Sequence, residues 1–148
     1  MVGPYVVTQA ICEHQETADD SIGMAAYNMD SHNCQRFVKD GAVYNEGDVE
    51  VKPRGPYPIA YRALTPKAEE CQNLLVPVCL SASHIAYGSI RMEPVFMVLG
   101  ESSAVASCHA IAENAPVQKI DVPKLQKQLL DAGQVLQYTP PATTGGKK

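Results

Sequence analysis

The last third of the chain carries apolar residues at the period of an α-helix. The positions that follow this spacing are Val95, Val98, Leu99, Ala106 and Ile111. Pro94 suits the first turn of a helix, where a missing N–H breaks no bond, so we expect a helix from about Glu93 to Glu113. A second helix is expected from Val122 to Asp131, because Asp121 can cap its N-terminus and Gly133 can end it.

Short β-branched and apolar runs predict strands in the first half of the chain. One such run extends from Tyr5 to Cys12, and another from Ile59 to Leu64. Between them, Asp40-Gly41 and Glu46-Gly47-Asp48 interrupt two short β-prone runs, which is typical of a hairpin.

The run from Asn73 to Ala82 is short and almost continuously apolar, which favours a strand buried on both faces, as in a parallel sheet. Pro77 cannot donate to a ladder, so we expect this strand to lie at an edge or to end there. Residues 81–91 then form a polar loop before the long helix. A strand, a loop and a helix in this order direct backbone N–H groups at a ligand, which predicts an α/β fold, with α+β as the alternative.

Composition limits the classes of function. With 148 residues, 45% of them apolar, the chain can bury one ordinary core. The formal net charge of −4 and the scattered Lys and Arg residues argue against a nucleic-acid partner. No uninterrupted apolar run has the length of a membrane span, and the N-terminus does not resemble a signal peptide, so we expect a cytoplasmic protein without a membrane partner.

The five cysteines lack the close spacing of a zinc site or a redox pair. We expect them to be reduced and mostly buried. Two local pairs, Cys12 with His14 and Cys108 with His109, could each offer two ligands, but spacing alone does not bring four together. We therefore expect no metal site.

Four longer stretches carry a resemblance to a known family: "YNMDSHN", "YPIAYRALTPK", "ECQNLLVPVCLSASHIAYGSIRMEPVFMVLGESSAVA" and "LLDAGQVL". Together they resemble, over residues 1–138, the C-terminal part of bacterial FAD-dependent oxidoreductases. The resemblance implies part of a doubly wound flavoprotein fold. In it, residues 1–72 would be a β-rich substrate-side segment, and residues 73–138 the last strand, loop and helix of an FAD domain plus a C-terminal helix. Residues 139–148 are expected to be a disordered tail.

The resemblance also implies which residues lie beside the flavin ring: Gly88, Ser89, Ile90, Arg91, Met92 and Glu93, with Ser83 and His84 in the preceding loop. N–H groups and a cation at this place would stabilise negative charge on the ring. The alternative is an ordinary helix start, in which Arg91 and Glu93 form an ion pair and His84 is a hydrogen-bonded loop residue.

By the same resemblance, Tyr27 to His32 belong to the substrate side of the flavin. His32 or Tyr27, with His84 as a further candidate, could exchange a proton during hydride transfer, since histidine titrates near neutral pH. The alternative is that Asp30 and His32 form a buried structural pair.

The sequence contains no GxGxxG turn of the kind that holds the FAD pyrophosphate. We therefore expect a C-terminal fragment or subunit that does not hold FAD alone. It would act with an FAD-binding N-terminal half or subunit on a small organic or carbohydrate-like substrate, and exposed apolar faces would favour self-association. Two alternatives stay open. One is a non-catalytic interaction module; the other is a small glycan hydrolase using paired carboxylates from among Asp30, Glu46, Asp48 and Glu93.

Overall fold

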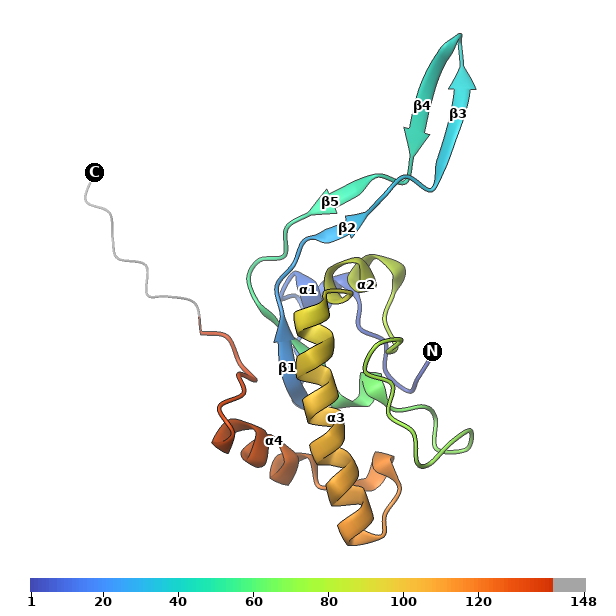
Figure 1. Cartoon of the computed structure of the whole chain (residues 1–148). Helices are drawn as coiled ribbons and strands as arrows, with labels where there is room; N and C mark the ends of the chain where they lie inside the picture. The colour runs from blue at the N-terminus through green and yellow to red at the C-terminus, as the bar shows by residue number, and fades with distance from the viewer. Residues whose placement is uncertain (140–148) are drawn as a thin grey trace, which may run out of the picture.

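The computed structural model describes residues 1–139, which form a helical body and a projecting β-ribbon (Figure 1). The expected disordered tail, residues 139–148, lies outside the described residues except for Thr139. The helices are α1 (Gln9–Cys12), α2 (His84–Ile90), α3 (Glu93–Glu113) and α4 (Val122–Asp131), with 3₁₀ turns η1 (Tyr61–Leu64) and η2 (Val117–Lys119). The strands are β1 (Ser21–Ala25), β2 (Met29–Ser31), β3 (Gln35–Lys39), β4 (Ala42–Glu46), β5 (Val49–Val51) and β6 (Tyr57–Ala60).

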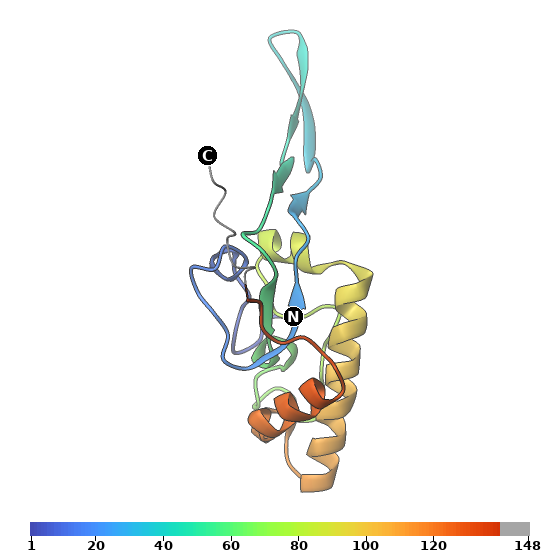
Figure 2. The same ribbon diagram turned by 90° about the vertical axis from the view of Figure 1, so that its left-hand side faces the viewer.

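The strands form three two-stranded sheets, all antiparallel: β1 with β6, β2 with β5, and β3 with β4. The first sheet packs in the body. The other two follow one another along a ribbon of residues 29–51, which we call the arm and which projects from the body in two perpendicular views (Figures 1 and 2). The mixed helix and strand content expected from the sequence is confirmed, and the sheets are small and antiparallel, as in the α+β form of that expectation.

The core lies between α3, β1, α2 and α4, where Ile22, Ile90, Leu99 and Leu125 are fully buried. Ser102 of α3 donates its hydroxyl to the carbonyl of Ile22 in β1, 2.7 Å away, and so fixes the helix against the sheet. By length and composition alone α3 could span a membrane, but one side of it is buried in this core.

Both predicted helices are confirmed at their bounds. Pro94 lies in the first turn of α3. The carboxylate of Asp121 accepts from the backbone N–H of Lys124 at 3.0 Å and caps α4. Gly133 follows α4 with a φ of 88°, a left-handed conformation that glycine adopts without strain. The predicted hairpin is confirmed too: β3 and β4 join through Asp40-Gly41, where both φ angles are positive.

The predicted strand from Asn73 to Ala82 is wrong, since Ala82 makes only an isolated parallel bridge to Val7. Separate backbone hydrogen bonds hold the segment instead. The N–H of Val76 donates to the carbonyl of Leu64, and the N–H of Ser81 donates to the carbonyl of Ala63. Pro77 has no N–H to continue a ladder, and no described strand lies alongside.

Three other predictions from local pattern need correction. The expected strand over residues 5–12 contains α1, and the strand over 59–64 ends at Ala60, where η1 begins. The loop expected over 81–91 contains α2, which the hydroxyl of Ser83 caps by accepting from the N–H of Ala86 at 3.4 Å.

The cysteines are less buried than expected. Of the five, only Cys12 is buried; Cys71 is partly exposed, and Cys34, Cys79 and Cys108 are exposed. Burial raises the pKa of the Cys12 thiol, which lowers its thiolate fraction near neutral pH.

Thiol labelling of the native chain should therefore distinguish these groups. We expect Cys34, Cys79 and Cys108 to react rapidly with a disulfide reagent at pH 8, while Cys12 reacts only on unfolding, because the thiolate is the nucleophile and needs access. Mass spectrometry of the labelled peptides provides the measurement. Labelling of Cys12 as fast as of Cys34 would contradict the buried position of α1.

Candidate functional site

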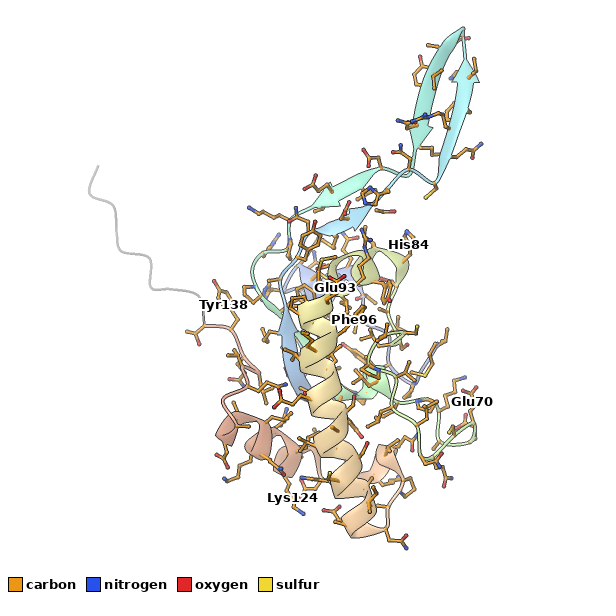
Figure 3. The ribbon with its side chains drawn as sticks, in the orientation of Figure 1. Glu70, His84, Glu93, Phe96, Lys124 and Tyr138 are labelled. Atoms are coloured by element: carbon orange, nitrogen blue, oxygen red, sulfur yellow. The ribbon has the colours of Figure 1, made fainter. Side chains whose placement is uncertain are left out.

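Two segments far apart in the sequence meet in a pocket between β2 and α2. The pocket has a volume of about 220 Å³ and is lined by Asp30, Ser31, His32, His84, Tyr87, Gly88 and Arg91. Figure 3 shows His84 on α2 near the base of the arm, and Glu93 in the first turn of α3. Four of the predicted site residues, His32, His84, Gly88 and Arg91, thus line one cavity, together with Asp30.

Gly88 permits this close packing of α2 on β2. A Cβ atom at this position would lie 2.5 Å from the backbone oxygen of Asp30, which is closer than side chains approach backbone. The absence of a side chain at Gly88 therefore sets the distance between the two halves of the pocket.

The substitution Gly88→Ala should destabilise the fold by about 1 to 3 kcal/mol, since the helix or the strand must shift to admit the methyl group. Urea unfolding measures this change. Gly100→Ala is the matched control: a Cβ there meets no atom within 4 Å, and alanine in a helix interior is favoured over glycine by up to about 1 kcal/mol. Equal stability of the two variants would contradict the tight α2–β2 contact.

Arg91 and Asp30 form the ion pair of the pocket. The Nη2 of Arg91 donates to Oδ2 of Asp30 at 3.0 Å, and the Asp30 side chain is largely buried. The alternative pairing of Arg91 with Glu93 does not occur among the described ion pairs. Asp30 thus orients the guanidinium, which remains partly open to solvent.

The two histidines of the pocket, His32 and His84, differ in their contacts and in their exposure. The Nε2 of His32 is 3.7 Å from Asp30, but 81% of the His32 side chain is exposed, so the alternative of a buried Asp30–His32 pair does not fit. The Nε2 of His84 shares a hydrogen bond of 3.2 Å with the hydroxyl of Ser31, and the tautomer of the ring decides which group donates. His32 is free to meet a ligand, whereas His84 is held in place.

The other predicted site residues have structural contacts. The hydroxyl of Tyr57 donates to Ser89 at 2.6 Å, and Ser89 in turn donates to the carbonyl of Tyr27, whose own side chain is half-exposed. Ile90 is fully buried, and Met92 precedes α3 without a side-chain capping bond. Ser83 caps α2, as described above. The proximity of these residues to a flavin stays a prediction.

Sequence reasoning missed Ser31, Tyr87 and Tyr57. The signal for Tyr87 is present: His84, Tyr87, Gly88 and Arg91 are spaced three and four residues apart and so share one helix face. This shared face could be found only by predicting residues 84–90 as a helix. Within residues 1–139, no group of three or more His, Cys, Asp or Glu side chains is arranged to hold a metal ion.

Comparison with known proteins agrees with the resemblance. The family model described as "FAD dependent oxidoreductase" matches residues 1–129, which include both segments of the pocket. No curated protein and no solved structure gives a significant match. The family match covers most of the chain, and the chain belongs to the FAD-dependent oxidoreductase family.

Proposed function

We propose that this chain supplies the flavin-ring and substrate side of the site in an FAD-dependent oxidoreductase. Its reaction would be hydride transfer from a small organic or carbohydrate-like substrate. The observation that carries this proposal is the pocket in which His32, His84 and the Arg91–Asp30 pair converge. Family membership supports the class of reaction.

The residues of the pocket fit one edge of a flavin ring. When bound, FAD would supply the hydride acceptor. Arg91 uses Nη2 for its bond to Asp30, and its remaining N–H groups can donate to an electron-rich ring edge. The pocket volume of about 220 Å³ is below the roughly 300 to 1,000 Å³ typical of ligand sites, so it suits part of a ring rather than a dinucleotide.

Each polar residue of the pocket would have its own role in binding the ring or in proton transfer. Asp30 would orient Arg91, and Arg91 would stabilise negative charge at the ring edge. His32, exposed at the mouth of the pocket, would exchange a proton with the substrate. Ser31 would hold the ring of His84 at the opposite wall.

Titration with lumiflavin, which is the ring system without ribose or phosphate, tests the role of Arg91. Reduced lumiflavin carries negative charge near neutral pH, and a hydrogen bond to a charged group is worth about 1.5 to 3 kcal/mol. The chain should therefore bind reduced lumiflavin about 10- to 100-fold more tightly than the oxidised form. Arg91→Ala should remove this preference. Arg54→Ala, which changes an exposed arginine outside the pocket, should keep it.

Equal affinity for both oxidation states in the unmodified chain would contradict the role of Arg91. Failure to bind either form would favour the non-catalytic module. The glycan-hydrolase alternative has less support. Asp30 is the only carboxylate that lines the pocket, and it pairs with Arg91, while Glu46, Asp48 and Glu93 do not line it.

A further inference from the structure

The outer part of the arm exposes all of its side chains. Every residue of β3 and β4 is exposed, and the hairpin projects away from the body in both views (Figures 1 and 2). A lone two-stranded hairpin is only marginally stable in water, and added strands stabilise it. Pairing with a further strand would therefore stabilise the outer part of the arm.

Both faces of the hairpin are apolar at its centre. On one face, Phe37 lies opposite Tyr44, and their rings stack with centroids 5.9 Å apart. On the other, Val38 lies opposite Val43, with exposed fractions of 72% and 66%. An additional strand would cover side chains on both faces at once.

The two outer edges differ in charge. The β3 edge carries Arg36 and Lys39, the kind of charged side chains that protect an edge from pairing. The β4 edge is uncharged from Ala42 to Asn45, and its one charge is Glu46 at the end. Thus β4 is the edge open to another strand.

The register identifies the backbone groups that point outward from β4. The loop has two residues, so Lys39 and Ala42 form the hydrogen-bonded pair that closes the hairpin, and bonded pairs alternate with non-bonded pairs from there. Val43 and Asn45 belong to non-bonded pairs. Their N–H and C=O groups point away from β3.

We propose that this edge pairs with the same edge of a second copy of the chain, antiparallel about a twofold axis at Tyr44. Val43 then exchanges backbone hydrogen bonds with Asn45 of the partner subunit, and the two Tyr44 side chains are neighbours. The product is a four-stranded sheet in the order β3, β4, β4, β3. Its backbone donors and acceptors match in this register because the outward groups of Val43 and Asn45 meet.

The charges favour this self-pairing over the other edge combinations. Each Glu46 lies opposite Ala42 of the partner subunit, so the two carboxylates stand at opposite ends of the interface. Pairing of β3 with β3 would gather four cations, from Arg36 and Lys39 of both copies. Pairing of β3 with β4 would leave edges free and build open chains instead of a closed dimer.

Matched proline substitutions test the edge. Proline at 43 removes an outward N–H of β4, and proline at 38 removes the corresponding outward N–H of β3, so both spare the bonds within the hairpin. Light scattering after size exclusion should give a dimer for the unmodified chain and for Val38→Pro. Val43→Pro should raise the dimer dissociation constant at least about tenfold, because two interface hydrogen bonds are lost.

Crosslinking tests the register. In a variant with the non-buried Cys34, Cys71, Cys79 and Cys108 changed to serine, Tyr44→Cys should form a disulfide-linked dimer, since non-bonded pairs bring Cα atoms to about 4.5 Å. Phe37→Cys should form no such disulfide, because β3 lies one strand further from the twofold axis than β4.

Three results would overturn the proposal. The first is a chain that does not dimerise with itself at any concentration, even if its β4 pairs with a strand of a different protein. The second is a dimer equally sensitive to both prolines. The third is crosslinking through position 37 but not 44.

Discussion

In an assembly of the proposed function, completed by an FAD-binding partner, replacement of His32 by asparagine is expected to lower turnover by roughly 10²- to 10⁴-fold, the usual contribution of a general acid or base. The imidazole is 81% exposed at the pocket mouth, and Asp30, 3.7 Å away, is its only ion-pair partner among residues 1–139. The substitution removes the titrating group but little packing. One limb of the pH profile of turnover should disappear with it.

His14→Asn is the matched control. His14 is also exposed, and its φ of 57° is a conformation that asparagine tolerates well. Turnover and unfolding free energy should both be unchanged. His84→Asn separates the two candidates in the pocket: a larger loss of turnover there than at His32 would assign the proton transfer to His84. A His32 variant that loses stability but keeps its turnover per folded molecule would instead indicate a structural role.

The parts of the fold that could be predicted depend on local signals. The helices α3 and α4 each combine helical spacing with a nearby start signal, Pro94 in one and Asp121 in the other. Asp40-Gly41 determines its hairpin in the same local way, through two positive φ angles. These interactions form within a few residues of one another, so the pattern was sufficient.

The errors arose where distant contacts decide the conformation. The apolar run after Asn73 resembles a buried strand, but its N–H groups donate to Ala63 and Leu64, and its one bridge is to Val7. Apolar pattern alone does not reveal which backbone groups will be nearby. Helix α2 is short, and the polar residues around its cap, Ser83, are equally typical of a loop.

The candidate site was predictable as a set of residue types but not as a geometry. His32, His84 and Arg91 could be selected by their chemistry, and the family match covers all three. The ion pair of Arg91 with Asp30 depends on the contact at Gly88, which joins segments 58 residues apart. No local pattern encodes that contact.

FAD is expected to bind this chain by itself no more tightly than lumiflavin does. Most of the affinity for a dinucleotide in doubly wound FAD-binding folds depends on a pyrophosphate held at a glycine-rich turn and a helix N-terminus. The chain has no GxGxxG turn, and the pocket accommodates only part of a ring. The purified chain should therefore be colourless. Fluorescence titration with FAD and with lumiflavin provides the two affinities.

The comparison of the two ligands isolates the phosphate contribution, because they share the same ring. Addition of a chain that bears a glycine-rich turn and completes the site should raise the affinity for FAD by orders of magnitude, since each charge-assisted bond to the pyrophosphate adds about 1.5 to 3 kcal/mol. The affinity for lumiflavin should rise far less. A yellow protein with one FAD per chain, purified without any partner, would contradict this prediction and would require a phosphate site elsewhere in the chain.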